Sequence, residues 1–286
     1  MTMNIELRKG APDDAGRCGE ICYRAFKVIA GRHNFPPDFP EPEIAVGVLR
    51  SLLSLPFVYS VVAESEGRIL GSNFLWEYEI AGVGPITVDP DVQNATVGRQ
   101  LMKDVMDRTA RKAFAGVRLV QAAYHNRSLS LYTKLGFDTR EPLSTMQGSP
   151  LKQVIPGSTV RPAKAADLAA CNDLCHRVHG HARGMELQGA VGQGTATVVE
   201  RGGRITGYAT LLGFFGHAVA ETNDDLKALI AAATEFSGPG FLLPTRNADL
   251  LRWCLEQGLR IVQPMTLMTM GMYQEPRGPF LPSILY

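Results

Sequence analysis

Two kinds of hydrophobic spacing alternate along the first half of the chain. Residues Asn4–Lys9 alternate between apolar and polar side chains, which predicts a strand, whereas apolar residues three or four positions apart predict a helix over Asp13–Ile29. The expected elements that follow are a helix over Glu43–Ser54, strands over Phe57–Glu64, Arg68–Glu79 and Val83–Val88, a helix from Val97, a strand over Val117–Tyr124, a helix over Arg127–Leu135 and a last strand after Gly136. This order predicts a mixed α/β fold whose strands are grouped early.

The second half of the chain repeats residues of the first half in the same order. One set of matches pairs Leu7, Arg8, Asp14, Cys18, Cys22 and Arg24 with Val160, Arg161, Asp167, Cys171, Cys175 and Arg177, all at one offset. Two later sets pair Gly67–Gly71 with Gly203–Gly207, and Leu129, Gly136 and Phe137 with Leu251, Gly258 and Leu259. Three ordered sets predict a degenerate duplication. Residues 147–158 hold two prolines and two glycines and are the expected linker between domains 1–147 and 158–286.

The second half predicts a similar order of elements in a shorter length of chain. They are strand Ser158–Arg161, helix Ala165–His179, strands Thr195–Glu200, Ile205–Leu212 and His217–Glu221, helix Asp224–Glu235, strand Phe241–Leu243, helix Ala248–Gln257 and strand Arg260–Tyr273. Thr222 and Asp225 predict a capping box at the start of the middle helix.

The composition is that of a globular protein without an excess of either charge. The chain has 286 residues, of which 45% are hydrophobic, and a formal net charge of +1. This balance argues against sequence-independent binding to nucleic acid. No apolar stretch approaches the roughly 18 residues that span a membrane, and five cysteines, an odd number, indicate reduced thiols rather than a disulfide framework. We therefore expect a cytoplasmic protein with no nucleic-acid or membrane partner.

The most informative segment comprises residues 86–101, where a buried strand is followed by a tight loop and a helix. The first amides of a helix have no partner within the helix, and with the helix dipole they can bind an anion. Small residues in the loop let a ligand approach the backbone, and Arg99 and Lys103 add positive charge. The alternative is a plain strand–loop–helix junction that is capped by Thr96 or Asn94.

This segment resembles the acyl-coenzyme A loop of the GNAT superfamily of N-acetyltransferases. The family pattern is V-x-P at the end of a strand, followed by Q/R-x-x-G-x-G/A. Residues 88–90, Gln93 and Gly98 match this pattern, whereas Thr96 stands where the first glycine usually is. A β-carbon at that position crowds the pyrophosphate and makes a positive φ costly.

A second segment, 124–137, resembles the other GNAT hallmark, N-x-x-(A/S)-x-x-(L/F)-Y-x-x-x-G-F. The matching residues are Asn126, Leu129, Tyr132, Gly136 and Phe137. One helix and one strand separate the two motifs, as in the family. The resemblance covers residues 4–146, and with the internal repeat it implies two tandem GNAT-like domains, the C-terminal one degenerate. Each is expected to hold a mixed, mostly antiparallel central sheet flanked by helices (an α+β arrangement).

The resemblance implies acetyl-CoA (coenzyme A) as co-substrate and no metal. Thr87 and Val88 would bind the pantetheine arm and polarise the thioester carbonyl, and Asn126 would bind the same arm. Tyr132 would protonate the leaving thiolate, although an aromatic residue of the core is the alternative. The loop residues expected to bind the cofactor, chiefly the pyrophosphate through backbone amides, are Gln93, Asn94, Ala95, Thr96, Val97, Gly98 and Arg99.

The general base and the acceptor pocket have several candidates. Glu77 and Glu79 share a strand face by alternation, His125 adjoins the second motif, and some GNAT proteins use water chains instead. In the family the loop at residues 31–42 covers the acceptor site. The residues expected to line an aromatic pocket there are His33, Phe35, Asp38 and Phe39. The alternative is a proline-rich surface loop with a hydrophobic anchor.

The second copy lacks an anion loop and a phenol at the tyrosine position, so we expect it not to bind coenzyme A. Cys171, Cys175 and His179 could align on one helix face as zinc ligands. However, Cys18 and Cys22 occupy the equivalent positions without histidines, which favours small core residues.

The sequence therefore predicts an acyl-CoA-dependent N-acyltransferase in which a small-molecule amine attacks the thioester directly; a homodimer is compatible with the sequence. Two alternatives remain. One is a protein that binds or senses acyl-CoA without transfer, which Thr96 and the lack of an obvious base motivate. The other is a scaffold with neither property.

Overall fold

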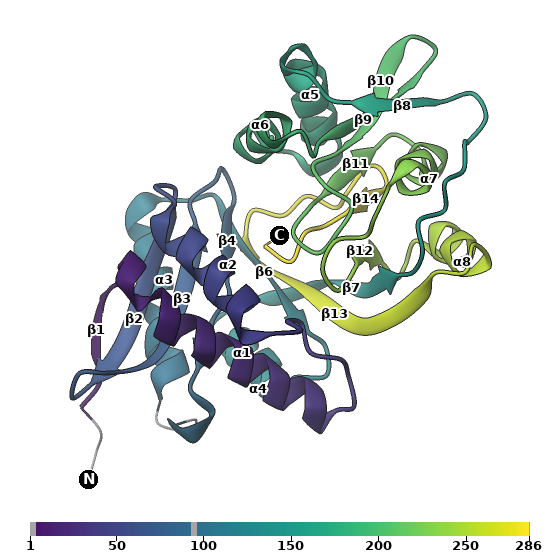
Figure 1. The fold of residues 1–286 in the computed structure, drawn as a ribbon. Helices are drawn as coiled ribbons and strands as arrows, with labels where there is room; N and C mark the ends of the chain where they lie inside the picture. Colours follow the sequence, from purple (N-terminus) through teal and green to yellow (C-terminus); the bar gives the residue numbers. More distant parts are fainter. Residues whose placement is uncertain (1–3, 93–95, 286) are drawn as a thin grey trace. The chain divides into compact units, whose positions relative to one another are not determined.

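A computed structural model describes residues 4–92 and 96–285. Its contacts divide the chain into two compact units (Figure 1). Of the described residues, the first unit comprises 4–92, 96–119, 130–135 and 285, and the second comprises 120–129 and 136–284. Each unit has its own sheet strands and helices, which meet in its own apolar clusters.

The sheet of the first unit consists of short, mostly antiparallel strands. In hydrogen-bonded order they are β1 (Glu6–Lys9), β2 (Val58–Ser65), β3 (Arg68–Trp76), β4 (Ala81–Val83) and β6 (Gly116–Ala122), and β5 (Thr87–Val88) pairs with β3. Strands β2 and β3 form a hairpin, and Glu66 and Gly67 at its turn have φ of 51° and 73°. Two successive positive φ values match the twist of the flanking strands. β4 and β6 run parallel.

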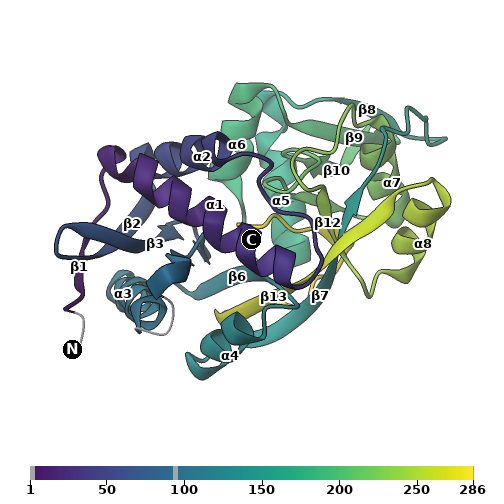
Figure 2. The same ribbon diagram turned by 60° about the horizontal axis from the view of Figure 1, so that its bottom comes forward.

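Helices cover both faces of this sheet (Figure 2). They are α1 (Ala15–Arg32), α2 (Pro42–Ser54) and α3 (Val97–Lys112), while α4 (Asn126–Lys134) is divided between the two units. α1 and α2 pack on one face and α3 on the other. The apolar spacing that predicts α1 becomes its buried side, where Cys18 and Cys22 join Leu49 of α2 and Phe74 of β3 in one cluster.

The second unit holds two groups of strands. One sheet has the order β14 (Phe280–Leu281), β11 (Ala218–Ala220), β10 (Arg204–Ala209), β9 (Thr197–Arg201) and β8 (Thr159–Pro162). The other group contains β12 (Phe241–Pro244), β7 (Asp138–Gln147) and β13 (Arg260–Gly271), with β7 antiparallel to both neighbours. The helices are α5 (Leu168–His179), α6 (Gly184–Gln193), α7 (Asn223–Ala232) and α8 (Ala248–Glu256).

Strand β7 comes from the first half of the sequence but lies between two strands of the second half. Leu143 in β7 pairs with Met265 in β13 on one side and with Pro244 in β12 on the other. Leu143, Met265 and Leu242 meet in one apolar cluster. The last strand of the first copy therefore completes the sheet of the second unit.

An ion network near the N-terminus fixes the start of the first copy. Both terminal nitrogens of Arg8 donate to Asp14 at 2.8 Å, and its Nε donates to Glu64 at 2.7 Å. Asp14 also accepts from the backbone N–H of Ala11 at 2.8 Å, which caps the following turn. The hydrogen bonds from Arg8 hold the pKa of Asp14 below its usual range.

The second copy contains the same network in equivalent residues. Arg161 donates to Asp167 at 2.7 and 2.9 Å and to Glu200 at 2.6 and 2.9 Å. Asp167 accepts from the backbone N–H of Lys164 at 2.7 Å, and the bonds from Arg161 lower its pKa. The repeat seen in the sequence is therefore also a repeat of side-chain geometry.

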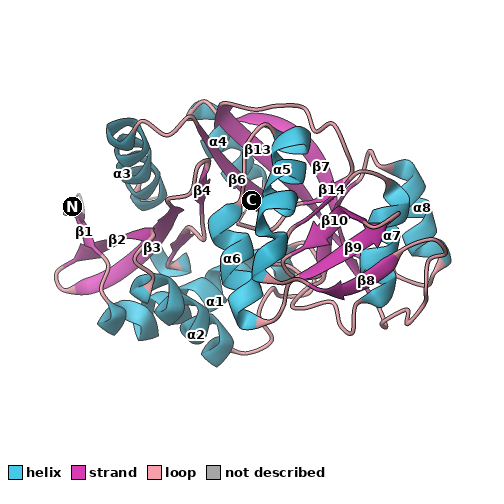
Figure 3. Cartoon of the chain, turned by 90° about the horizontal axis from the view of Figure 1, so that it is seen from above, coloured by secondary structure: helices cyan, strands magenta, loops and turns pink. Residues whose placement is uncertain are grey.

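Some details of the predicted elements are wrong. The strand expected over Arg68–Glu79 ends at Trp76, and the one expected over Val83–Val88 is divided into β4 and β5. Pro85 lies at this break, and proline cannot donate a hydrogen bond to a neighbouring strand. Helix α6, beside α5 in Figure 3, was not expected. Its three glycines weaken the helical signal, and burial of Leu187 and Ala190 compensates.

Candidate functional site

The break between β4 and β5 leaves an open strand edge in the first unit. β4 pairs with β6 at Ala81–Val117 and Gly82–Arg118. Beyond the break, β5 pairs with β3, and no strand of the described residues pairs with its other edge. Backbone groups on such an edge can bind an extended ligand as another strand would. Thr87 and Val88, the predicted pantetheine-binding residues, form β5.

The backbone of Thr96 has the conformation that the family pattern assigns to glycine. Its φ is 66° and ψ is −2°, in the left-handed region, directly before α3. Its side chain makes no capping hydrogen bond to a helix amide; its Oγ1 accepts from Nε2 of Gln100 at 3.4 Å. Thr96 is therefore the N-cap residue of α3, as this alternative expects, but its side chain does not cap a helix amide. The other alternative, Asn94, and the predicted ligands Gln93 and Ala95 lie outside the described residues.

Gly98 lies in the first turn of α3, where the chain itself does not require glycine. A Cβ added there would lie 3.6 Å from Val88 Cγ2, an ordinary contact, and Gly98 is not among the residues with positive φ. Val97 is buried and Arg99 is exposed. Lys103, one turn on, forms an exposed ion pair with Asp107 at 2.8 Å.

Asp89, which links β5 to the loop, is a site residue that the sequence did not reveal. Its carboxylate is fully buried and accepts hydrogen bonds from Arg17 at 2.6 Å, Arg68 at 2.8 Å and Arg24 at 3.4 Å. Burial by itself would raise the pKa of Asp89, but the bond from Arg68 and the other positive charges outweigh it and lower the pKa. The available sequence signal was that Arg24 and the segment Gly67–Gly71, which contains Arg68, both recur in the second half of the chain.

Asn126, Leu129 and Tyr132 of the second motif lie in α4, and Gly136 and Phe137 lie between α4 and β7. Tyr132 is 6% exposed, and its placement is compatible with both of its predicted roles. Asn126 begins the helix. His125 Nδ1 and Ser128 Oγ lie 2.8 Å apart, so this histidine takes part in a local hydrogen bond.

The two glutamates proposed as bases differ in surroundings. Both follow the end of β3, so the strand alternation expected to place them on one face does not apply. Glu77 forms an ion pair with Arg108 of α3, whose guanidinium lies 4.3 Å from the ring centre of Tyr59. Glu79 is exposed. The ion pair of Glu77 therefore joins the segment after β3 to helix α3.

The predicted acceptor loop is anchored by one of its aromatic residues. Phe39 is buried in the α1–α2 cluster, and its ring centre lies 6.1 Å from that of Phe26. Phe35 and Asp38 are half-buried, and His33 is exposed. Phe39 thus acts as the hydrophobic anchor of the loop.

A second aromatic group in the first unit was missed by sequence reasoning. Phe57 and Tyr78 stack with ring centres 5.6 Å apart, and Trp76 lies 5.9 Å from Tyr78. Leu285, near the end of the chain, packs against this same cluster. Gly82 permits the approach, since a Cβ there would lie 2.4 Å from the carbonyl oxygen of Leu285.

In the second unit, the strand edge equivalent to the open edge of β5 is paired with another strand. β11, the counterpart of β5, pairs with β10 on one side and β14 on the other, and Ala220 donates to the carbonyl of Pro279. The predicted capping box is confirmed: Thr222 Oγ1 accepts from the backbone N–H of Asp225 at 3.3 Å, and Asp225 accepts from that of Thr222 at 3.1 Å. Neither an open edge nor a loop is left at this position.

The two cysteines of α5 and its His179 lie in the interior of the second unit, whereas His176 is exposed. Cys171 and Cys175 lie in an apolar cluster, and burial raises the pKa of Cys171 to about 12. Within the described residues, no group of three or more histidine, cysteine or acidic side chains could hold a metal ion. No helix among the same residues is both long and apolar enough to cross a bilayer.

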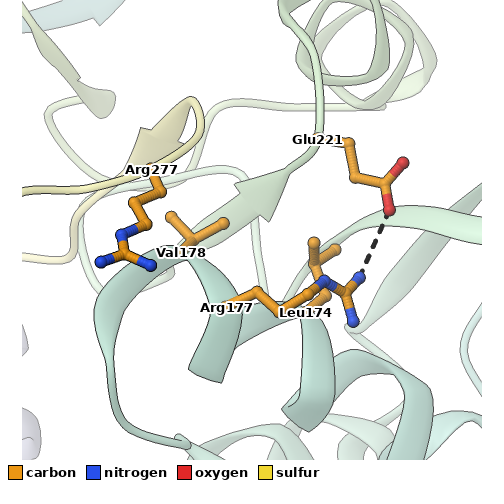
Figure 4. Close-up of a pocket in the computed structure, with 5 residues that line it drawn as sticks. All are labelled: Leu174, Arg177, Val178, Glu221 and Arg277. Atoms are coloured by element: carbon orange, nitrogen blue, oxygen red, sulfur yellow. Dashed lines mark hydrogen bonds and ion pairs between the residues drawn. The ribbon is translucent and has the colours of Figure 1, made fainter.

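A pocket of about 420 Å³ lies beside α5 in the second unit (Figure 4). Leu174 and Val178 are its apolar residues, and Arg177, Arg277 and Glu221 are its charged ones. Arg177 donates to Glu221 at 3.3 Å. This pair is the counterpart of Arg24 and Asp89 in the first copy.

Comparison with known proteins agrees with this geometry. Residues 57–139 match the family model for the acetyltransferase (GNAT) domain, a span that includes β5, α3 and Tyr132. Solved structures match nearly the whole length of the chain. A candidate acetyltransferase of Pyrococcus horikoshii has a TM-score of 0.75 at 17% identity, covering 96% of this chain and 94% of that one. The chain has the GNAT fold.

Two further solved structures extend the GNAT likeness over both halves. The GCN5-related N-acetyltransferase of Sphaerobacter thermophilus has a TM-score of 0.64 at 14% identity, with 95% of this chain and 96% of that one covered. A tandem GNAT protein from the clavulanic acid biosynthesis pathway has a TM-score of 0.55 at 13% identity, with 96% and 99% covered. The predicted fold class is confirmed. No protein of curated function matches the sequence.

Proposed function

We propose that this GNAT-fold protein is an acyl-CoA-dependent N-acyltransferase that transfers an acetyl group from acetyl-CoA to an amine. The observation that carries the proposal is the open edge of β5, which precedes α3 in the chain, with the turn at Pro90–Val92 between them. An extended pantetheine arm fits the edge of β5, and a pyrophosphate fits the N-terminal turn of α3. The match of residues 57–139 to the GNAT domain supports the same assignment.

The binding roles follow from what each segment offers. Backbone groups of Thr87 and Val88 would pair with the amides of the pantetheine arm. The backbone amides of Thr96, Val97, Gly98 and Arg99 would face the pyrophosphate, where the helix dipole favours negative charge. A Cβ at position 98 would make only an ordinary contact within the chain, so packing does not require glycine there. The absence of a side chain at Gly98 instead leaves room for the pyrophosphate. The role of Asn126 remains a prediction from its motif.

The reaction proceeds by direct attack of the amine on the thioester. The amine nitrogen forms a bond to the carbonyl carbon, and the carbon–sulfur bond then breaks. Tyr132 gives its phenolic proton to the departing sulfur, and the attacking nitrogen loses a proton to Glu79 or to water. Glu79 is the better base candidate, because Glu77 is held in an ion pair with Arg108. Proton exchange with solvent restores both groups.

The proposed acceptor is a small-molecule amine. The near-neutral charge of the chain does not favour a strongly charged macromolecule. The stacked rings of Phe57 and Tyr78, which are only partly buried, offer flat apolar surface to a compact substrate. A panel of small amines is therefore the first set of acceptors to test.

Calorimetric titration with acetyl-CoA tests the cofactor site. We expect one saturable site per chain in the wild type and its loss in Gly98→Asp, which adds negative charge to the first turn of α3. Gly47→Asp in α2 is the matched control, because nothing lies within 4 Å of an added Cβ there. Absence of binding to the wild type would contradict the proposal.

Release of the coenzyme A thiol with an amine panel tests transfer. Removal of a general acid lowers the rate by about 10²- to 10⁴-fold, so Tyr132→Phe should lose most turnover and keep its acetyl-CoA affinity. Tyr23→Phe is the control, because the Tyr23 hydroxyl accepts an exposed hydrogen bond from Lys27 on the same helix at 3.1 Å. Full turnover by Tyr132→Phe would remove this residue from the mechanism.

The second candidate function is acyl-CoA binding without transfer. The side chain of Thr96 in a left-handed position favours it, since a β-carbon there crowds a bound pyrophosphate. A saturable acetyl-CoA complex with no thiol release across the whole amine panel would support this function instead.

A further inference from the structure

We infer that Asp89 and the three arginines around it are positioning residues that hold the cofactor loop in its binding geometry. Asp89 directly follows β5 and directly precedes the short turn at Pro90–Val92. Its carboxylate joins groups from three parts of the first unit: two positions of α1, the start of β3 and the backbone of the loop itself. This inference rests on the proposed function, because the loop matters only if it binds acyl-CoA.

The contacts of Asp89 tie the loop to the rigid elements. Arg17 and Arg24 lie two helical turns apart on α1, and Arg68 begins β3. Arg17 and Arg68 donate to the same oxygen of Asp89 at 2.6 and 2.8 Å. On the loop side, the backbone N–H of Asp91 donates to the Asp89 carboxylate at 3.1 Å, and that of Val92 to its carbonyl at 3.0 Å.

A fully buried carboxylate is stable only when charges and hydrogen bonds replace water. The three guanidiniums and one backbone amide supply that replacement here. The arginines also depend on the carboxylate, since their positive charges would repel one another without it. Removing either side therefore weakens the attachment of the first loop residues to α1 and β3, although Arg24 of α1 still pairs with Asp91 at 3.0 Å.

The second copy shows which part of this cluster accompanies the loop. Its counterpart of Asp89 is Glu221, which accepts from Arg204 at 2.7 Å and from Arg177 at 3.3 Å. These arginines correspond to Arg68 and Arg24 in the repeat. The counterpart of Arg17 is Ala170, at the same offset as the other matches.

The two carboxylates also differ in burial. Asp89 is 0% exposed in its side chain, whereas Glu221 is 25% exposed. In the second copy α7 begins after Thr222 alone, so no loop needs to be held. The third arginine and the full burial are thus found in the copy that retains the loop. Arg17 is the residue by which the Asp89 cluster of the first copy differs from the Glu221 cluster of the second.

The test measures acetyl-CoA affinity by calorimetry in Arg17→Ala, Arg17→Lys and Asp89→Asn. Misplacement of a binding group by a distant change costs up to about 100-fold. We expect Kd and KM for acetyl-CoA to rise about tenfold in Arg17→Ala, with kcat at saturating acetyl-CoA unchanged. Arg17→Lys keeps the charge and should recover part of the affinity. Glu221→Gln in the second copy is the control and should leave Kd unchanged.

Hydrogen exchange in the unliganded protein provides a readout that does not depend on the ligand. Arg17→Ala should speed exchange at the amides of Asp91 and Val92 while the amides of β2 keep their protection. Asp89→Asn could unfold the first unit, whereas Arg17→Ala leaves two arginines on Asp89 and should fold. Unchanged exchange and unchanged Kd in folded Arg17→Ala would overturn the inference. Absence of acetyl-CoA binding by the wild type would instead overturn the proposed function, and the exchange result would still decide whether Arg17 holds the loop.

Discussion

Replacement of Thr96 by glycine tests whether the loop carries the strain that its backbone implies. Thr96 has φ of 66°, and a left-handed conformation costs a residue with a β-carbon about 1–2 kcal/mol. Glycine avoids this cost but loses about 0.5–1 kcal/mol more conformational entropy on folding. The hydrogen bond from Gln100 to Thr96 Oγ1 is exposed and long, 3.4 Å, so its loss subtracts little. Thr96→Gly should therefore stabilise the first unit by somewhat less than about 1 kcal/mol.

Ala113 provides a matched control at the other end of the same helix. It also has a left-handed backbone, with φ of 55° and ψ of 40°. Ala113→Gly should stabilise α3 by a similar amount. Calorimetric unfolding measures both, and a gain of 1 kcal/mol raises Tm by about 2–4 °C in a chain of roughly this size. Exchange of the α3 amides would assign the gain to the first unit if the two units unfold separately.

Acetyl-CoA affinity separates the two glycine variants. The left-handed strain at Thr96 is present with and without ligand if the loop keeps its shape, so it cancels from the binding free energy. Affinity then reports crowding by the side chain, and Thr96→Gly should bind acetyl-CoA more tightly while Ala113→Gly matches the wild type. Loss of stability in Thr96→Gly beside a gain in Ala113→Gly would refute the strain argument, and equal affinity in all three proteins would refute the crowding argument.

Three further predictions concern charges and thiols. Glu79→Gln should lower turnover at least about tenfold. Glu77→Gln should keep turnover but reduce stability by up to about 1 kcal/mol, because it breaks the ion pair with Arg108. Equal rates for both variants would exclude Glu79 as base. Hydrogen bonds from arginine lower the pKa of Asp14 and Asp167 in the folded state, so the stability they provide is complete above the unfolded pKa of about 3.9 and is lost as the pH falls through the lower folded values. Unfolding free energies measured from pH 5 downward should therefore decline, and Asp14→Asn should reduce the decline. Burial raises the pKa of Cys18 to about 11 and that of Cys254 to about 12, so a thiol reagent at pH 8 should modify none of the five buried cysteines before unfolding; rapid labelling of any one would contradict the packing.

Local patterns in the sequence were sufficient for most elements and for the duplication. The spacing of Cys18 and Cys22 identifies the buried side of α1, and Thr222 with Asp225 identifies the start of α7. These signals are local, because helical periodicity and capping involve residues within one or two turns. The resemblance of residues 57–139 to the GNAT domain was readable for the same reason, since both motifs are short continuous segments.

Tertiary structure alone decided which charged residues meet and which strand edges stay open. Asp89 lies 72 residues from Arg17 and 21 from Arg68 in sequence, and no periodicity links them. Likewise, the pairing of β7 with β12 and β13 and the closure of the β11 edge by β14 depend on contacts between distant segments. A sequence records which side chains can form ion pairs and strands, but burial selects among the partners by removing water from some of them. The loop motif was therefore visible in the sequence, and the cluster that anchors it was visible only in the fold.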